Sequence, residues 1–292
     1  MRLTSIWRAN AALAAWSPGR PDTMADAVRR SPSDLGLRLI SAAVMIPFAL
    51  FVVWQGGILL AIGCAGLALG MGYEWVRMSA SPLMKQFLPL AALPVLIVAL
   101  TSPVLGLVAL LFCAALAGGL HPLLRERTYS AMGLAYVAGM ALAGYLLRAG
   151  PWDGAAAALI TMGMVWGSDS AAYFTGRTIG GPKLTPDSPS KTWSGAIGAV
   201  IFTSLCGLLA WFIAGGDWLI WMIVGVLISI FAQMGDLVES RIKRRYGVKD
   251  ASALIPGHGG VLDRVDGLGI VFVFMTLALY AMPFLRVQLG LV

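Results

Sequence analysis

The residues best suited to chemistry gather in one polar run, residues 240–266, near the C-terminal end of the chain. The run holds six of the 21 Lys and Arg residues, three Asp and one of the two His. Long apolar stretches flank it, in a chain that is 59% hydrophobic and 12% charged. This composition is typical of a membrane protein, in which charge belongs in a loop exposed to water or in a site that lines a hydrophilic cavity. We interpret the run as a site.

Carboxylates lie where each of the two apolar segments that border this run meets it. Asp236 ends one segment, and Ser240 and Lys243 follow it at helical spacing. Asp263 and Asp266 are three residues apart, so they share a face if a helix begins there. Carboxylates from two segments that meet at the membrane edge suit Mg²⁺, which takes one or two carboxylates and completes its shell with water and phosphate. Taken singly, each Asp also fits an ordinary charged loop.

A glycine-rich turn, residues 256–260, reads Pro-Gly-His-Gly-Gly. Glycine tolerates positive φ and close backbone approach, so the amides of Gly259 and Gly260 are candidates for binding phosphate. His258 is a candidate acid or base, although a loop histidine more often fixes the turn by hydrogen bonding. A tight turn before a helix is the alternative interpretation.

Asp169 lies inside a predicted membrane span, where an ionisable group is a functional candidate. If the helix continues past Phe174, Tyr173 and Arg177 lie on the same face at steps of four residues. The alternative is a structural ion pair between Asp169 and Arg177.

A second polar connection, residues 176–195, carries three basic residues and six Ser or Thr hydroxyls. It does not match the phosphate-binding loop of nucleotide hydrolases, because Pro182 separates Gly181 from Lys183 and the connection follows a helix. Its composition still favours polyphosphate recognition, and a solvated basic loop is the alternative.

The hydrophobic pattern predicts an all-α polytopic membrane protein with about nine transmembrane helices. Each predicted segment approaches the roughly 20 residues that cross a bilayer. The segments are residues 37–54, 58–73, 87–100, 103–120, 131–147, 155–174, 196–214, 218–234 and 268–284. We expect residues 1–34 to be a disordered cytosolic tail, and residues 35–292 to be one transmembrane domain with its catalytic half at about 155–284.

The distribution of positive charge predicts the orientation of the chain. Nineteen of the 21 Lys and Arg residues fall in the N-terminal tail and in alternate connections, which places these in the cytosol and the C-terminus outside. We expect this basic face to attract anionic membrane lipids. We expect no nucleic-acid partner.

The polar run also resembles a known family. Its motif residues match the signature of the phosphatidate cytidylyltransferases (CDP-diacylglycerol synthases) without a gap, and GSDSAAYFTGR and SPSKTW upstream resemble that family's second block. The resemblance covers about residues 166–267. Two departures are Ser194, where members usually carry Glu, and Ser190, where Lys or Gly is frequent. The matching residues are Ser240, Lys243, Arg244, Lys249, Asp250, Ser252, Ile255, Pro256, His258, Gly259, Gly260, Asp263, Arg264, Val265 and Asp266.

The resemblance implies an all-helical homodimer in the inner (cytoplasmic) membrane, with its active site facing the cytosol. Members transfer CMP from CTP to phosphatidate, giving CDP-diacylglycerol and pyrophosphate, by metal-assisted attack of the lipid phosphate on the α-phosphate of CTP. Mg²⁺, often with K⁺, is the implied cofactor, and Asp236 and Asp263 are the implied metal ligands. Trp193 and Tyr246 are both candidates for stacking on the cytosine.

The motif and the helical spacing together give two sets of candidate residues. The expected catalytic set is Asp236, Lys243, Arg244, Lys249, Asp250, His258, Asp263, Arg264 and Asp266. The expected substrate-binding set is Asp169, Tyr173, Arg177, Ser188, Lys191, Thr192, Ser240, Gly259 and Gly260.

Two other functions remain as alternatives. A related nucleotidyl- or phosphotransferase would act on another lipid, such as an isoprenoid alcohol, which needs activation by a base. A secondary transporter would place ionisable residues near the bilayer midplane, whereas here they cluster at one face.

Overall fold

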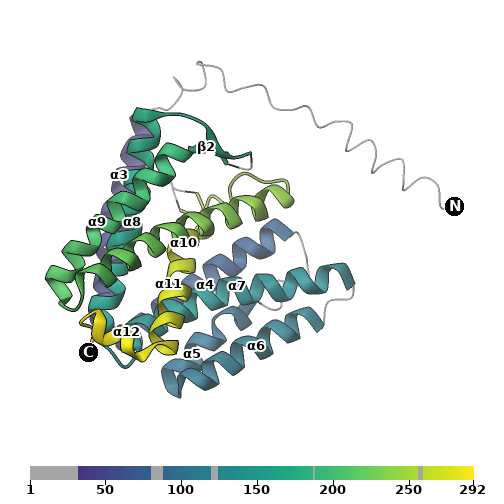
Figure 1. The fold of residues 1–292 in the computed structure, drawn as a ribbon. Helices are drawn as coiled ribbons and strands as arrows, with labels where there is room; N and C mark the ends of the chain where they lie inside the picture. The colour runs from purple at the N-terminus through teal and green to yellow at the C-terminus, as the bar shows by residue number, and fades with distance from the viewer. Residues whose placement is uncertain (1–31, 80–87, 120–123, 187, 256–258) are drawn as a thin grey trace, which may run out of the picture.

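The computed structural model describes residues 32–79, 88–119, 124–186, 188–255 and 259–292 (Figure 1). His258 and almost all of the predicted N-terminal tail therefore lie outside the described residues. Within the described ranges the chain forms ten α-helices and one two-stranded antiparallel hairpin, which confirms the all-α polytopic prediction. These elements are α3 (Pro32–Gln55), α4 (Gly57–Ser79), α5 (Leu93–Leu100), α6 (Pro103–Gly119), α7 (Leu124–Ala149), α8 (Gly154–Ile179), β1 (Lys183–Thr185), β2 (Ser188–Thr192), α9 (Trp193–Ala214), α10 (Trp218–Arg245), α11 (Leu262–Ala281) and α12 (Pro283–Gln288).

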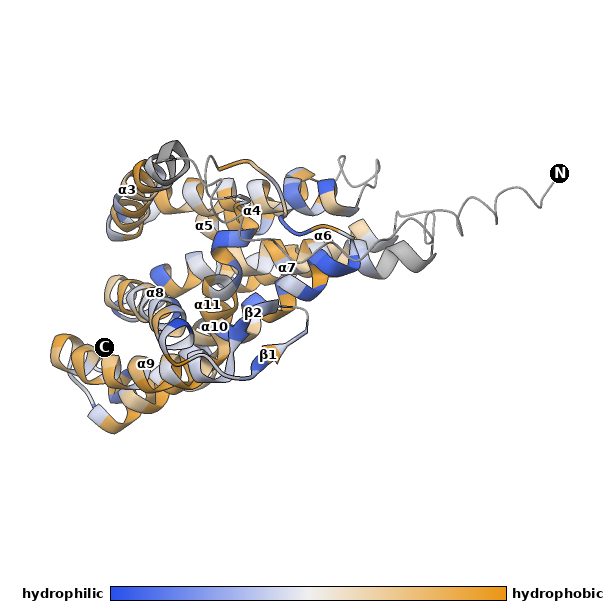
Figure 2. Ribbon diagram, turned by 90° about the horizontal axis from the view of Figure 1, so that it is seen from above, coloured by the Kyte–Doolittle hydropathy of each residue, from blue (hydrophilic) through white to orange (hydrophobic). Residues whose placement is uncertain are grey.

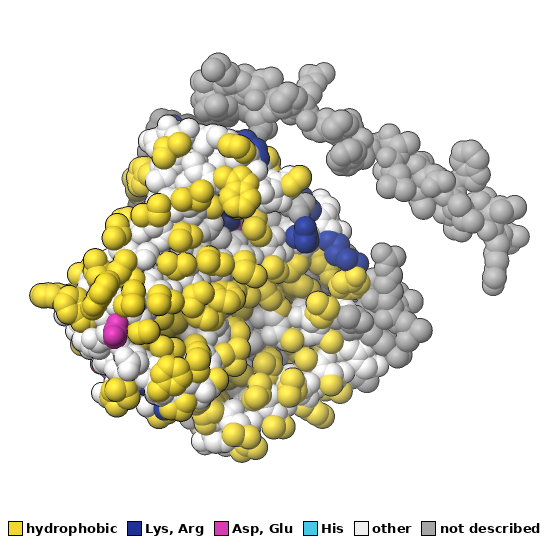
Figure 3. All heavy atoms as spheres, in the orientation of Figure 1, with side chains coloured by type: hydrophobic (Ala, Val, Ile, Leu, Met, Phe, Trp, Pro, Cys, Tyr) yellow, Lys and Arg dark blue, Asp and Glu magenta, His cyan; other side chains and the backbone are white. Residues whose placement is uncertain are grey.

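Five of these helices are long and apolar enough to cross a membrane, namely α4, most of α7, α9, α10 and α11. Shorter apolar helices are Leu39–Gln55 within α3 and Pro103–Gly119. Hydrophobic side chains cover the face shown in Figure 3, and most of its Lys and Arg side chains lie toward one edge. The sides of the membrane on which the two termini lie stay a prediction.

The helix boundaries differ from the predicted spans in ways that matter for the site. Helix α10 continues through its polar end to Arg245, eleven residues beyond the predicted end, and α8 continues to Ile179. The third predicted span is wrong as a full-length helix. Its α-helical part, α5, has eight residues, and rises only about 12 Å. The hairpin of β1 and β2 was not predicted.

Two hydrophobic clusters hold the helices together. Residues of α4, α5, α6 and α7 form most of the first cluster, and residues of α8, α10 and α11 form most of the second. Val53 and Val265 pack against both clusters. The chain ends in the second cluster, where Leu289 and Leu291 are fully buried. In Figure 1, α10 and α11 lie between the pair α8–α9 and the group α4–α7.

Polar residues fix the ends of the helices that carry the site. Asp153 caps α8 by accepting a hydrogen bond from the amide of Ala156, and Asp217 caps α10 by accepting from the amides of Leu219 and Ile220. Thr192 caps α9 by accepting from the amide of Gly195. These caps satisfy donors that a helix end leaves unpaired.

Candidate active site

The site is built where α10 and α11 cross at two glycines. A Cβ atom added to Gly235 would lie 2.6 Å from the carbonyl oxygen of Asp266 and 2.8 Å from the Cα atom of Gly267. One added to Gly267 would lie 2.8 Å from Oδ1 of Asp236. The two backbones can approach this closely only because glycine has no side chain. The crossing therefore brings carboxylates of α10 and α11 to one place.

A polar cavity of about 400 Å³ opens at this crossing. Residues of α8, β2, α10 and α11 line it, and Figure 2 shows hydrophilic stretches of these elements near β2, within mostly hydrophobic helices. Seven of the eight lining residues belong to the predicted site, and Trp166 is the addition. The lining residues are Trp166, Asp169, Lys191, Asp236, Ser240, Asp263, Arg264 and Asp266.

Two lysines pair with the carboxylates that were predicted to hold a metal. Lys191, on β2, forms an ion pair with Asp236 and so ties the hairpin to α10. Lys243 donates to Oδ1 of Asp263 at 2.7 Å and forms an ion pair with Glu239 at 2.8 Å. The Lys243 pairs are largely buried, because the side chains of Lys243, Glu239 and Asp263 are 12%, 3% and 9% exposed. Each carboxylate thus has a cation beside it.

Asp263 also holds the backbone of the α10–α11 connection. Its Oδ2 atom accepts hydrogen bonds from the amides of Gly260 at 2.9 Å and Ala251 at 3.2 Å. Asp263 lies in the first turn of α11, where the helix dipole favours negative charge. The predicted shared face of Asp263 and Asp266 is confirmed, since α11 begins at Leu262 and both residues line the cavity.

Glu239 is a site residue that the sequence reasoning missed. It lies on α10, three residues after Asp236 and four before Lys243, and is 2% exposed. Its Oε1 atom has no hydrogen-bond partner among the described residues. The helical spacing that singled out Asp236 and Lys243 includes Glu239 and would have found it.

Glu74 is the second residue missed. It lies on α4 and is fully buried. It accepts hydrogen bonds from the hydroxyl of Ser252 and from the amides of Val261 and Leu262. In the sequence, Glu74 is a lone carboxylate one residue past the predicted span 58–73. Its position there placed it in a connection rather than in a site.

On α8, the predicted face of Asp169, Tyr173 and Arg177 divides into two parts. Asp169 lines the cavity, whereas Tyr173 and Arg177 are exposed and do not. A guanidinium nitrogen of Arg177 donates to the Tyr173 hydroxyl at 2.6 Å. No ion pair joins Asp169 to Arg177, both of which the structure describes.

The hairpin residues support α9 rather than the cavity, apart from Lys191. Thr192 is buried as the cap of α9, and Ser188 starts β2. The Ser194 hydroxyl bonds to the carbonyl oxygen of Gly180 and to the Thr192 hydroxyl, so this departure from the family pattern ties the two ends of the hairpin.

The remaining predicted residues lie at the end of α10 and in the α10–α11 connection. Arg244 donates to the carbonyl oxygen of Val248, and Lys249 and Asp250 are exposed in the connection. Gly259 has a φ of +81° and pairs with Ile255, so its conformation is one that glycine adopts readily. None of these residues lines the cavity.

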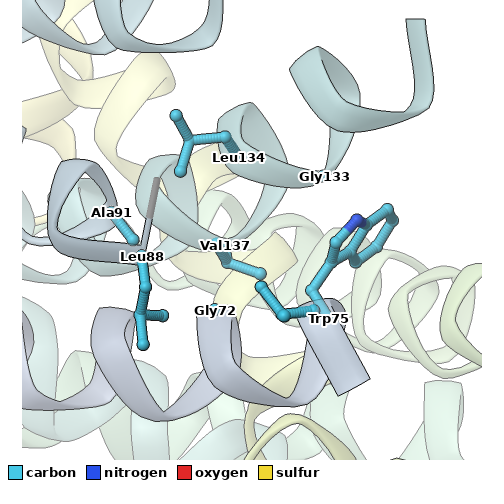
Figure 4. Close-up of a pocket in the computed structure, with 8 residues that line it drawn as sticks. Gly72, Trp75, Leu88, Ala91, Gly133, Leu134 and Val137 are labelled. Atoms are coloured by element: carbon cyan, nitrogen blue, oxygen red, sulfur yellow. The ribbon is translucent and has the colours of Figure 1, made fainter. Parts of the chain in front are cut away.

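A second, apolar crevice lies between α4, α7 and residues 88–91 (Figure 4). Trp75, Leu134 and Val137 contribute to its walls, and its volume is about 10 Å³. This is at the lower limit for one water molecule. The crevice is a packing defect and has no groups that could do chemistry.

The donor set of the polar cavity fits Mg²⁺. Within the described ranges no group of three His, Cys, Asp or Glu residues is arranged to hold a metal by itself. Asp236 and Asp263 nevertheless offer carboxylate oxygens from two helices to one cavity. Because Mg²⁺ commonly takes only one or two carboxylates beside water and phosphate oxygens, two such groups suffice.

Comparison with known proteins yields consistent matches. The model of the cytidylyltransferase family matches residues 36–282. The chain is 40% identical over 261 residues to a phosphatidate cytidylyltransferase of Brucella suis, a match that covers 86% of this chain and 96% of that protein. It is 38% identical over 123 residues to a protein of the same name from Bacillus subtilis, covering 40% of this chain and 46% of that one.

Proposed function

Because this chain belongs to the cytidylyltransferase family and is a nucleotidyltransferase that uses CTP, we propose that it transfers CMP from CTP to phosphatidate. The products would be CDP-diacylglycerol and pyrophosphate. The observation that carries the proposal is the polar cavity in which four Asp face Lys191 and Arg264 beside the ends of apolar helices. The choice of phosphatidate is supported by the near full-length similarity to the Brucella suis protein, whose name states this substrate.

The proposed nucleophile is a phosphate oxygen of phosphatidate. It would form a bond to the α-phosphorus of CTP while the bond from that phosphorus to the bridging oxygen of the β-phosphate breaks, releasing pyrophosphate. A phosphomonoester with a second pKa of about 6 is mostly ionised near neutral pH. The reaction then needs no strong general base, and none of the described residues that line the cavity is a histidine.

Charge control and positioning are the tasks left to the protein. Lys191 and Arg264 line the cavity and would contact the phosphates of CTP and the departing pyrophosphate. Lys243 donates to Asp263 and would keep this carboxylate oriented. Asp236 and Asp263 would hold Mg²⁺, with K⁺ as an additional cofactor, and the metal would neutralise phosphate charge.

The two aromatic candidates for stacking on cytosine differ in their surroundings. The ring of Tyr246 packs edge-on against Trp75 at 6.0 Å, within the first hydrophobic cluster. Trp193 is 54% exposed at the start of α9, two residues after Lys191. Trp193 is therefore the better candidate.

The membrane setting follows from the same proposal. The protein would be a multi-pass homodimer of the inner membrane, with the cavity facing the cytosol, where CTP is dissolved. The excess of Lys and Arg in alternate connections supports this orientation. The same basic face would attract anionic lipids.

The test is transfer of labelled CMP from CTP into lipid by the purified protein in detergent, with phosphatidate as the acceptor. Asp236→Asn and Asp263→Asn are expected to lower the rate at least 100-fold, because each removes a carboxylate charge from the cavity. Asp217→Asn is the matched control. It makes the same chemical change at the N-cap of α10, where Asn caps as well as Asp, and should keep full activity.

The outcomes separate the parts of the proposal. Wild-type protein that binds CTP but transfers nothing to phosphatidate would contradict the choice of acceptor. Near-normal turnover in either cavity variant would contradict the role of that carboxylate.

A further inference from the structure

A carboxylate from the first half of the chain reaches the site. Glu74, on α4, is 0% exposed and accepts three hydrogen bonds from the α10–α11 connection and the start of α11. The donors are the Ser252 hydroxyl at 2.6 Å, the Val261 amide at 2.7 Å and the Leu262 amide at 2.7 Å. No Lys or Arg forms an ion pair with Glu74 in the described structure. Among the described residues, the hydrogen-bond partners of the Glu74 carboxylate are these three donors.

The arrangement is an N-terminal cap supplied from another helix. The first amides of a helix lack partners within the helix, and the helix dipole favours an anion beside them. The residue in the N-cap position of α11, Val261, has no side-chain group that can accept these bonds. Glu74 takes this role from 187 residues away in the sequence.

Glu74 and Asp263 both accept hydrogen bonds from the α10–α11 connection, and they bind neighbouring residues of it. Asp263 binds the amides of Ala251 and Gly260, and Glu74 binds Ser252 and the amide of Val261. Neighbouring residues of the connection are therefore held by different carboxylates. Moving one of them shifts the backbone that orients the other.

The close approach of Gly260 shows how tightly this contact is fitted. A Cβ atom at this position would lie 2.7–2.9 Å from the carboxylate atoms of Glu74. Such a distance is too short for any real Cβ contact, so a side chain here would push Glu74 away. Gly260 thus leaves room for the Glu74 carboxylate in its present position.

We propose that Glu74 is a positioning residue for the reaction, which acts by fixing residues 251–252 and 260–262 and, through them, the orientation of the Asp263 carboxylate in the cavity. This inference rests on the proposed function. Glu74 is not among the residues that line the cavity, so we expect it to contact neither substrate nor metal. Its effect reaches the chemistry only through Asp263.

The test compares Glu74→Gln with the wild type in the transfer assay, at varied Mg²⁺ and CTP. Gln keeps the size of the side chain but presents an N–H group to one of the donors. We expect kcat to fall at least 10-fold and the Mg²⁺ concentration for half activation to rise several-fold. Glu74→Asp keeps a carboxylate on a shorter side chain. Its kcat and its Mg²⁺ midpoint should lie between those of the wild type and Glu74→Gln.

Hydrogen exchange gives a readout that does not depend on activity. In Glu74→Gln, the amides of residues 251–255 and 259–262 should exchange at least 10-fold faster, while residues 268–279 of α11 stay protected. Thr276→Val is the matched control. It removes a buried hydrogen bond from α11 to the carbonyl oxygen of Ala143, away from the site, and should change neither the Mg²⁺ dependence nor this exchange.

Each outcome decides the question. Folded Glu74→Gln with wild-type kcat, Mg²⁺ dependence and exchange would overturn the proposal. If this variant does not fold, Ser252→Ala removes one of the three bonds, and an unchanged Mg²⁺ midpoint there overturns it equally. An inactive wild type counts against phosphatidate transfer instead, and exchange in the variant still tests the contact.

Discussion

Substitution of Gly235 by Ala tests whether the α10–α11 crossing sets the geometry of the site. The added Cβ would lie 2.6 Å from the carbonyl oxygen of Asp266, and an ordinary contact begins at 3.4 Å. The obstructing atoms belong to backbone and cannot rotate away. The helices must therefore separate by about 0.8 Å, the difference between these two distances.

The expected cost in stability is small, because two effects oppose each other. Overpacking costs about 1–3 kcal/mol, and replacing a helical Gly by Ala recovers about 1 kcal/mol. The net loss is then about 0–2 kcal/mol. The thermal midpoint in detergent should fall by only a few degrees.

The expected cost in activity is much larger. A misplacement of about 1 Å can lower a rate about 100-fold, and the separation would move Asp236 away from Asp263 and Asp266. We expect kcat for CMP transfer to fall about 10- to 100-fold. Gly163→Ala on α8 is the control, since a Cβ there meets nothing within 4 Å and should leave the rate unchanged.

The test compares the loss of kcat with the loss of stability in Gly235→Ala. Gly235→Ala with activity within two-fold of the wild type would show that the close crossing does not set the site. A loss of activity that merely follows loss of folded protein, measured by monodispersity and thermal midpoint, would refute the reasoning equally.

Three further predictions concern the cavity and its surroundings. Lys191→Met removes the partner of Asp236 and a cation of the cavity, so kcat/KM for CTP should fall at least 10-fold, whereas Lys183→Met, exposed on β1, should be neutral. Chelation with EDTA should abolish transfer and added Mg²⁺ should restore it; full activity in EDTA would exclude the proposed cofactor. Tyr173→Phe breaks the exposed bond to Arg177 outside the cavity, and steady-state kinetics should change less than three-fold.

Most of the cavity could be predicted from the sequence because its residues lie at helical spacing within short segments. Asp263 and Asp266 share a face of α11, and Asp236 and Ser240 share a face of α10, as period 3.6 requires. Charged residues are also scarce in this chain, so each one near an apolar segment was a strong signal.

The residues that prediction missed depend on long-range packing. Glu74 meets its partners 178 to 188 residues away, and no local pattern encodes that contact. The glycine crossing is a similar case, since 35 glycines are present and only the packed helices show that Gly235 and Gly267 meet. The short α5 and the hairpin were missed because hydropathy reports burial in apolar surroundings rather than the local backbone path.

The length of α10 explains why a single helix can serve both as a membrane span and as a wall of the site. Its apolar part, residues 218–234, rises about 25 Å at 1.5 Å per residue, close to the hydrocarbon thickness of about 30 Å. Asp236 comes two residues later, so it falls near the boundary between hydrocarbon and headgroups. The phosphate of a membrane lipid occupies that same depth. A lipid phosphate could therefore reach the cavity without leaving the bilayer, whereas a soluble acceptor would gain nothing from this placement, which favours a lipid as the acceptor.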